Sequence, residues 1–328
     1  MILKRILWGL FWVSAIFVLL MITPRVWSAL NSDKPPVGYH FLAPTYLAIG
    51  VGLEELINKR PAVPETIEEF KNVEYKSVNG KSLQLNIYKP KNLTKRAPLL
   101  VFIHGGGWSG GERADYLVYV IAFAKKGYVT ATVSYRLTNV APYPACAEDI
   151  TDAVQWLFKN GEKYSYDPDR IALIGGSAGA HLALLAAYGW KKPGEIPDTL
   201  ANPVSKHRIK AVVDIYGPTD LTTEFSRTNS TVTGFLHCTY EQAPEVFLEA
   251  SPIHYLNKNN PPTMILHGTS DQTVPISQSD LLKARLDSLG VPNLYYRVPL
   301  WPHTMDIIKR VNTFSEAKMT GFFEKYLN

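Results

Sequence analysis

Residues 170–189 read RIALIGGSAGAHLALLAAYG. The apolar, β-branched run from Ile171 to Ile174 is typical of a buried strand, and the Ala- and Leu-rich run that ends the segment is typical of a buried helix. Small residues surround Ser177 because a sharp turn would bring the two backbones too close for larger side chains. We interpret G-x-S-x-G in this context as a nucleophile turn, with Ser177 raised above a sheet at the positive end of a helix.

Apolar runs and helical patterns alternate along most of the chain. The expected strands are PLLVFIH, YVTATVSY, RIALIG, IKAVVDIY, PTMILHG and LYYRVP, and helices are expected near residues 115–126, 146–159, 178–188, 277–289 and 304–327. This order predicts an α/β fold, with a mostly parallel central sheet and helices on both faces. A strand–Asn79-Gly80–strand pattern from Val73 predicts a hairpin at one edge. Residues 219–262 interrupt the alternation and predict a lid insertion.

A serine hydroxyl needs a base that takes its proton and a carboxylate that orients the base. Six histidines follow Ser177; His181 is expected to pack structurally, and His207 lies in a polar stretch. His303, in LWPHTMD after the last strand, follows an acidic residue at a strand end, Asp271 in MILHGTSDQTVP. A turn-capping aspartate and a surface histidine are the alternatives, but their joint position favours a triad of Ser177, Asp271 and His303. Such a triad needs no metal and no organic cofactor.

The sequence HGGGW at 104–108 directly follows the strand PLLVFI. Consecutive glycines allow backbone N–H groups to point at a carbonyl oxygen that becomes negative in the transition state. We predict an oxyanion hole formed by the amides of Gly106, Gly107 and Ala178. The predicted substrate pocket is lined by three aromatic side chains, Trp108, Phe225 and Phe235.

From about residue 73 onward the chain resembles the α/β-hydrolase superfamily, and within it the carboxylesterases related to hormone-sensitive lipase and the acetyl/feruloyl esterases. The resemblance rests on HGGGW at 104–108, DPDRIALIGGSAGAHLA at 167–183, HGTSDQTVP at 267–275 and PH at 302–303. Relatives of hormone-sensitive lipase usually carry Asp before the serine, where this chain has Gly176. This departure places the chain nearer the acetyl and feruloyl esterases.

The resemblance implies a serine carboxylesterase that hydrolyses short-acyl or acetyl esters of small molecules through an acyl-enzyme. A prenylcysteine methylesterase and a formamidase or amidase-like hydrolase are alternatives within the superfamily. A catalytically silent hydrolase-fold binding protein is the alternative from another class. Asp149 and Asp152, in PYPACAEDITDAVQWL, match a family pattern and are expected to support the loops.

The N-terminus carries the uncharged run ILWGLFWVSAIFVLLMI at residues 6–22, after Lys4 and Arg5. Its length is near the lower limit for a membrane-spanning helix and long for the apolar part of a signal peptide. Arg25 ends the run, and Trp27 follows where an interfacial aromatic residue would lie. We expect residues 1–30 to be an uncleaved membrane anchor, with the catalytic domain on the non-cytoplasmic side. A secreted or periplasmic protein, formed by signal cleavage, is the alternative.

The rest of the chain is expected to contain a tether with a packing helix at 31–72, amphipathic over Tyr46 to Asn58, and a catalytic domain at 73–328. Its basic residues are scattered and its net charge is +5, without a basic stripe interleaved with aromatics, so nucleic-acid binding is not expected. Cys146 and Cys238 fit neither a disulfide framework nor a CxxC metal site, and their pairing stays open.

Overall fold

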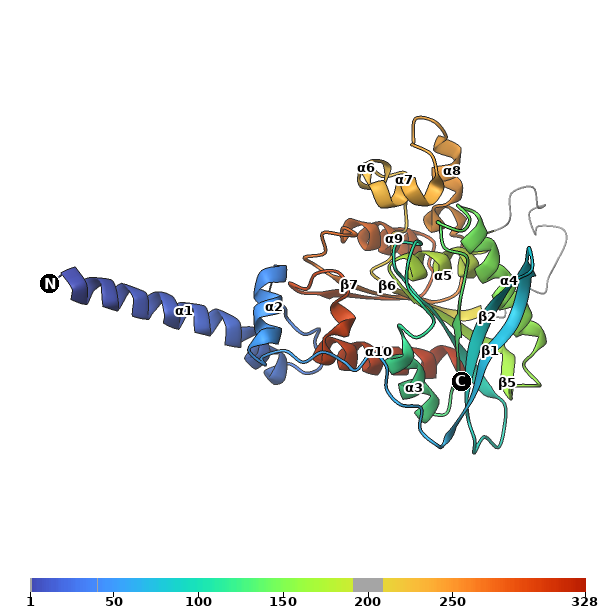
Figure 1. Ribbon diagram of the computed structural model, residues 1–328, viewed down its shortest axis with the longest axis horizontal. Coiled ribbons are helices and arrows are strands. Elements are labelled where there is room, and N and C mark those ends of the chain that lie inside the picture. The colour runs from blue at the N-terminus through green and yellow to red at the C-terminus, as the bar shows by residue number, and fades with distance from the viewer. Residues whose placement is uncertain (1, 40, 191–208) are drawn as a thin grey trace.

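A twisted β-sheet forms the centre of the molecule in this computed structural model, which describes residues 2–39, 41–190 and 209–328 (Figure 1). His207 lies outside the described residues. The eight strands of the described sheet have the order β1-β2-β4-β3-β5-β6-β7-β8. The β1–β2 and β2–β4 pairs are antiparallel and all other pairs are parallel, which confirms the predicted mostly parallel sheet. The strands are β1 Ile67–Val78, β2 Lys81–Pro90, β3 Ala97–Ile103, β4 Val129–Val133, β5 Tyr166–Gly176, β6 Ile209–Ile215, β7 Thr263–Gly268 and β8 Asn293–Val298.

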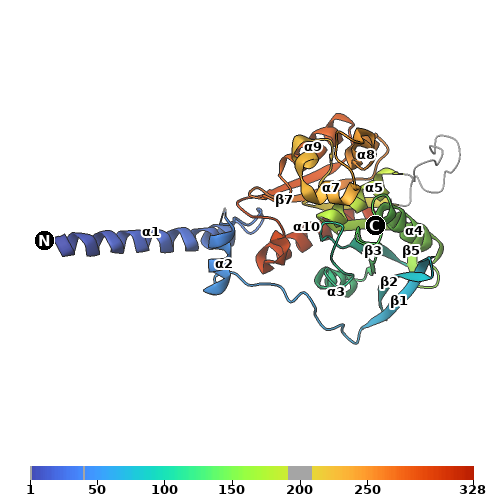
Figure 2. The same cartoon turned by 45° about the horizontal axis from the view of Figure 1, so that its top comes forward.

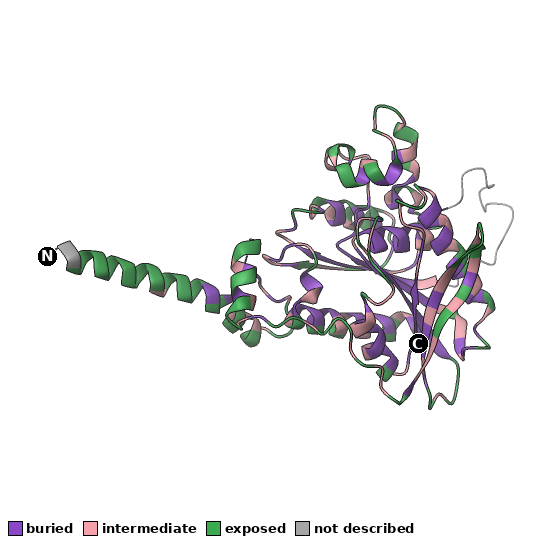
Figure 3. Cartoon of the chain, viewed as in Figure 1, coloured by how far each residue is buried: buried purple, intermediate pink, exposed green. Residues whose placement is uncertain are grey.

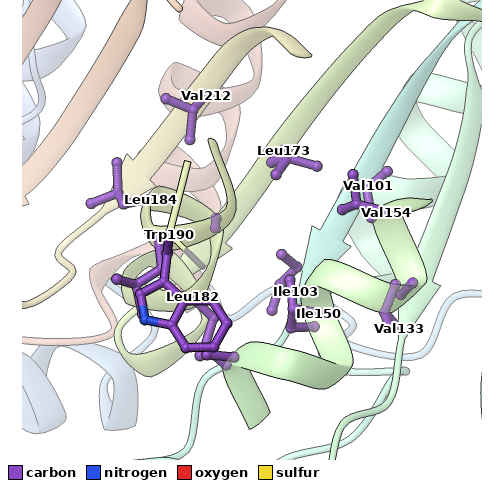
Figure 4. Packing of buried hydrophobic residues seen from close by; sticks show 14 of the residues in the cluster. Val101, Ile103, Val133, Ile150, Val154, Leu173, Leu182, Leu184, Trp190 and Val212 are labelled. Atoms are coloured by element: carbon purple, nitrogen blue, oxygen red, sulfur yellow. The ribbon is translucent and has the colours of Figure 1, made fainter. Parts of the chain in front are cut away.

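Helices cover both faces of this sheet. On one face pack α4 Ala145–Lys159, α5 Ala178–Tyr188 and α9 Ser277–Ser288, and on the other α3 Leu117–Lys125 and α10 Lys309–Leu327. Alternate residues of β3 enter opposite cores: Val101 packs with the α4–α5 side and Phe102 with the α3–α10 side. Figure 4 shows the first of these cores, where Ile150 of α4 and Leu182 of α5 lie over the sheet.

The hairpin at the edge starts earlier than expected. Asn79 and Gly80 form its turn with positive φ angles of 49° and 74°, but β1 begins at Ile67 rather than Val73. Half of residues 67–72 are charged, which this edge strand tolerates because it has one hydrogen-bonded neighbour and one solvent-facing side. The register also shifts between Phe70 and Val73, which breaks the polar–apolar alternation that identifies strands in sequence.

The insertion between β6 and β7 folds into short helices that gather beside α5 and α9 in both views (Figures 1 and 2). They are α6 Glu224–Thr228, α7 Ser230–Leu236, α8 Pro244–Glu249 and η1 Pro252–Tyr255. Phe235 and Phe247 of these helices belong to the same core as α4 and α5. Cys238 follows α7 and is a free thiol, as is the buried Cys146 of α4.

The carboxylate of Asp149 in α4 contacts two other parts of the chain, the loop after β4 and strand β1. Its side chain is fully buried and accepts hydrogen bonds from the Arg136 backbone N–H at 2.9 Å and from the Arg136 Nε at 2.7 Å. Lys76 of β1 reaches the Asp149 carboxylate at 2.8 Å and the Asp152 carboxylate at 2.6 Å. These contacts hold the loop after β4 against α4 and β1.

The N-terminal helix α1, Ile2–Leu30, projects away from the sheet, and most of its side chains are exposed (Figures 1 and 3). The packing helix α2 occupies Leu42–Gly50, earlier than the expected stretch from Tyr46 to Asn58. It ends there because the chain turns at Gly52, with φ of 74°, and brings Glu54 inward.

The predicted helix at 304–327 is divided at Ile308. The short helix η2, Met305–Ile307, precedes α10, and Ile308 between them has extended backbone angles. Ile308 forms an isolated antiparallel bridge with Leu56, and this long-range pairing interrupts a locally helical sequence.

Candidate active site

Ser177 lies in a strained turn between β5 and α5. Its φ of 55° and ψ of −125° are sparsely populated for a residue with a side chain. The surrounding glycines are required by close contacts: a Cβ on Gly179 would lie 2.1 Å from the Ile103 carbonyl oxygen. A Cβ on Gly176 would lie 1.8 Å from the Tyr116 hydroxyl. The small residues around Ser177 therefore have the steric cause that the sequence predicts.

The structure brings Ser177, His303 and Asp271 together at the carboxyl ends of their strands. The His303 Nε2 lies 3.0 Å from the Ser177 Oγ, and the His303 Nδ1 lies 2.6 Å from the Asp271 Oδ2. With the proton on Nδ1, the ring donates to the carboxylate and accepts from the serine hydroxyl. This is the tautomer that a general base requires.

Asp271 is fixed by groups beyond the triad. The backbone N–H groups of Thr273 and Val274 donate to its Oδ1 at 2.8 and 2.9 Å. Burial alone would raise the pKa of Asp271, but hydrogen bonds from His267 and His303 outweigh it and lower the pKa to about 2. Asp271 therefore stays ionised beside the imidazole.

His267 is a residue of the site that sequence analysis missed. It is fully buried, and its Nε2 lies 3.2 Å from the Asp271 Oδ2 and 2.9 Å from the Val274 carbonyl oxygen. Its Nδ1 lies 2.7 Å from the Ser279 Oγ. The spacing His267-x-x-x-Asp271 was visible in sequence, but strand β7 ends between them, so no helical or strand periodicity predicted the contact.

The glycine loop after β3 presents unpaired backbone donors beside Ser177. Gly106 and Gly107 have positive φ angles of 106° and 58°, which orient their amides differently from those of a strand. Ala178 is the first residue of α5, so its N–H has no partner within the helix. Among the described residues, these three amides donate no hydrogen bond, which leaves them available to an anionic oxygen.

Trp108 is fixed by two contacts behind the loop. Its Nε1 donates to the His181 Nδ1 at 3.2 Å, and its ring stacks on Phe235 with 4.2 Å between centroids. Burial lowers the pKa of His181 to about 4, so this ring is neutral and acts structurally, as expected. The Nε2 of His181 donates to the Ala250 carbonyl oxygen at 2.7 Å.

A cavity of about 400 Å³ opens over Ser177 and His303. Trp108 and Phe225 line it together with the three loop glycines, and their role in binding substrate stays a prediction. Phe235, also predicted for the pocket, does not line this cavity: its side chain is 1% exposed and stacks on Trp108. The direction of an aromatic side chain on α7 depends on how that helix is rotated, which composition does not specify.

Three further polar side chains meet at this cavity. The Tyr216 hydroxyl donates to the Asp306 carboxylate in a short hydrogen bond and is also hydrogen-bonded to the Tyr116 hydroxyl. Burial raises the pKa of all three groups. The Tyr216 ring also packs 4.6 Å from the His303 ring. No local motif predicts this cluster, because Tyr116 precedes α3, Tyr216 follows β6 and Asp306 belongs to η2.

Together, the sheet order, the turn at Ser177 and the histidine–aspartate pair define an α/β-hydrolase. The BD-FAE family model matches residues 85–286, and the chain belongs to this family.

Similar proteins include the esterase LipC of Mycobacterium tuberculosis, which is 30% identical over 250 residues, covering 73% of this chain and 61% of LipC. The versiconal hemiacetal acetate esterase of Dothistroma septosporum is 29% identical over 280 residues, covering 80% of this chain and 82% of that enzyme. A solved structure of a truncated carbohydrate esterase from gut microbiota is 26% identical, with a TM-score of 0.68, and covers 81% of this chain and 98% of that one. The chain spans 54–61% of the first three curated relatives.

Proposed function

We propose that this protein is a serine carboxylesterase that hydrolyses short-acyl or acetyl esters through an acyl-enzyme intermediate. The observation that carries the proposal is the continuous hydrogen-bonded chain from the Ser177 hydroxyl through His303 to Asp271, at the base of a cavity. The similar proteins named as esterases support the same reaction class.

In the acylation step, His303 takes the proton of Ser177 while the hydroxyl oxygen attacks the ester carbonyl carbon. Asp271, ionised and hydrogen-bonded to Nδ1, holds the imidazole in place and stabilises the imidazolium that forms. His303 then donates its proton to the departing alcohol oxygen, and the acyl group remains on Ser177.

The amides of Gly106, Gly107 and Ala178 would hold the negative oxygen of the tetrahedral intermediate. Their lack of other partners supports this role, and removing one such donor typically lowers the rate by about 10²–10³. In the second step, His303 deprotonates a water molecule that attacks the acyl-enzyme. The acid leaves and the Ser177 hydroxyl is restored.

A short acyl group fits the apolar side of the cavity. Trp108 is held by His181 and stacked on Phe235, so it forms a wall that cannot easily move aside for a long chain. Phe225 and Val232 line the cavity from α6 and α7. We infer that the insertion at 219–262 acts as the lid over this acyl pocket.

The length, apolar character and packing of α1 support its role as a membrane anchor that is retained in the mature protein. Residues Lys4–Leu30 form one helix that is long and apolar enough to cross a membrane, and its most apolar part is 6% buried. The last third of α1 packs on the body: Met21 is 6% exposed, and the Ser28 hydroxyl accepts a hydrogen bond from Arg310 at 2.8 Å. Cleavage after residue 28 would remove these contacts. Lys4 and Arg5 favour a cytoplasmic N-terminus, with the body on the other side.

Labelling with a fluorophosphonate probe tests the nucleophile. Wild-type protein should be labelled at Ser177 and the Ser177→Ala variant should not. A panel of p-nitrophenyl esters from acetate to palmitate should then give the highest kcat/KM for the shortest acyl groups. Absence of labelling in folded wild-type protein would refute the esterase, and a maximum at palmitate would refute the short acyl pocket.

The anchor is tested separately by sequencing the N-terminus of membrane-extracted protein. We expect a chain that still contains residues 4–22 and resists extraction by alkaline carbonate. A soluble protein that starts beyond residue 22 would establish the cleaved signal instead.

A further inference from the structure

The α2 helix exposes an uncharged face. Its sequence, LAPTYLAIG, has no charged residue, and Leu42, Tyr46 and Leu47 are 50%, 66% and 41% exposed. Thr45 and Ala48 on the opposite face are buried against the body. Phe41 before the helix and Val51 after it are also more than half exposed. An exposed apolar face of this kind marks a contact with a membrane or with another apolar surface.

The orientation of α2 fits this position. In both views α2 runs across the axis of α1, at the end of α1 that meets the body (Figures 1 and 2). A helix that crosses a bilayer stands near the membrane normal, so a helix that runs across it lies along the bilayer surface rather than through it. If α1 spans the membrane, α2 therefore lies at the level of the headgroups, beside the point where α1 leaves the hydrocarbon.

A basic groove lies at the same end of the molecule. It is lined by residues of α1, the following loop and α10, including Arg25, Lys34, Lys309, Arg310 and Lys318. Glu54 and Glu55, which also line it, are paired with Arg310 and Lys309. Among the described residues, Arg25, Lys34 and Lys318 have no carboxylate partner within ion-pair distance. This excess of positive charge complements the phosphates of an anionic membrane surface.

The catalytic cavity opens close to this surface. Ile57 and the exposed Lys59, which line its rim, follow α2 by seven and nine residues. The Ile57 N–H donates to the Ile307 carbonyl at 2.9 Å, and Ile307 also lines the cavity. Leu56, next to Ile57, is 52% exposed. The chain thus runs from α2 to the cavity within nine residues, with Leu56 exposed between them.

We propose that α2 and the basic groove form a membrane-docking surface, and that the cavity takes substrate from the bilayer. This inference rests on the proposed esterase activity and anchor, and it extends them to a substrate class: short-acyl esters of a lipophilic alcohol. The alcohol part stays in the lipid while the acyl group reaches Ser177.

The test compares two esters in vesicles of phosphatidylcholine and phosphatidylglycerol that contain the full-length protein. One ester, p-nitrophenyl acetate, reaches the site from water, and the other, hexadecyl acetate, resides in the bilayer. The variant L42E/L47E places two charges on the docking face. Its matched control is L281E/L294E, which changes two leucines on α9 and β8 that are 41% and 38% exposed.

We expect L42E/L47E to release acetate from hexadecyl acetate about tenfold more slowly, while its turnover of p-nitrophenyl acetate stays within about twofold of wild type. The control variant should match wild type on both esters. Equal hydrolysis of hexadecyl acetate by L42E/L47E and wild type would overturn the docking surface. If wild type hydrolyses neither ester, the esterase proposal is what fails.

A depth measurement decides the position of α2 whatever the activity. A nitroxide label is attached to Tyr46→Cys, and to Leu281→Cys as control, in a Cys238→Ser background that leaves the buried Cys146. We expect the label at 46 to collide more often with oxygen than with a water-soluble nickel chelate, and the label at 281 to show the reverse. A water-like signal at 46 would refute the proposal. If the signal at 46 does not change when phosphatidylglycerol is omitted, the basic groove is not part of the surface.

Discussion

The carboxyl edge of the sheet and the N-terminal arm, which is the helix α1, are both exceptions to the usual burial of side chains. The two exceptions are opposite in kind. At the sheet edge, polar groups are buried: His267 is fully covered, and Asp271 and Asp306 are less than 10% exposed. On the arm, apolar groups are exposed, and Trp8, Phe11 and other large side chains of α1 are more than half accessible. A buried polar group is stable only when it has hydrogen-bond partners. A large exposed apolar surface is instead more stable against lipid or another apolar surface than against water.

Each of these two exceptions therefore indicates the kind of contact that its region requires. The polar groups at the sheet edge are paired in hydrogen bonds that run from Ser177 through His303 to Asp271. The side chains of α1 have no partners of that kind, and fully burying one large apolar side chain is worth about 1.5–3 kcal/mol. A lipid environment would stabilise this row of residues by many times that amount.

The largest expected effect follows from removing the nucleophile, Ser177. Ser177→Ala should lower kcat for p-nitrophenyl acetate by about 10⁴–10⁶, because the residual rate depends on the oxyanion amides and binding alone. The melting temperature should stay close to that of wild type. A variant that retains near-normal turnover would show that the buried polar cluster serves structure rather than chemistry.

Asp271→Asn should lower kcat by about 10⁴, because an amide cannot hold the same histidine tautomer. The variant also removes a carboxylate whose titration makes the free energy of unfolding depend on pH. The pKa of Asp271 is depressed from 3.8 to about 2 in the folded state, so its ionised form stabilises the fold above pH 4, and that contribution disappears as the pH falls through 2. Denaturant titrations should show wild type losing about 2 kcal/mol relative to the variant between pH 5 and 2. A constant difference across this range would contradict the assigned pairing.

The junction between the two regions depends on a buried ion pair. Arg310 binds both carboxylate oxygens of Glu54 at 2.9 Å and also reaches Ser28 of α1. Arg310→Ala should destabilise the fold by about 3 kcal/mol, because it leaves Glu54, 4% exposed, without its partner. The adjacent Lys309→Ala removes an exposed pair with Glu55 and should cost far less stability than Arg310→Ala. Equal costs in chemical denaturation would show that the arm is not held by Arg310.

The smallest expected effect concerns the packing under Ser177. Gly179→Ala should destabilise the fold by about 2 kcal/mol, because its Cβ would meet the Ile103 and His104 backbones, which cannot rotate away. Gly234→Ala in α7 is the matched control, since nothing lies within 4 Å of its Cβ. There alanine should stabilise the helix by up to about 1 kcal/mol. Thermal denaturation of both variants should therefore show shifts of opposite sign.

Much of the fold could be predicted from sequence because its signals are local. Runs such as PLLVFIH and RIALIG are long enough to identify buried parallel strands, and Asn79-Gly80 identifies the hairpin turn. The meeting of Ser177, Asp271 and His303 could also be predicted, because each follows a strand and parallel strands end at one edge of the sheet. The catalytic role of the three residues remains a prediction.

Other features arise from contacts that local sequence does not encode. The break at Ile308 depends on pairing with Leu56, about 250 residues away in the chain. The return of the tether to the cavity at Ile57 depends on the same contact. Phe235 was assigned to the pocket from its residue type, but the rotation of α7 turns it behind Trp108. The partners of Asp306 likewise come from separate elements.

The α1 helix runs through Pro24 into the body without a break, and it is held there by Met21 and Ser28. If α1 spans a membrane, these contacts couple the tilt of α1 to the orientation of the catalytic domain. In a thicker bilayer the helix would stand more upright, and in a thinner one it would lean. For an anchored protein, each change in tilt would turn the entrance above Ser177 relative to the lipid, and membrane thickness would then influence how readily a substrate in the bilayer reaches the cavity.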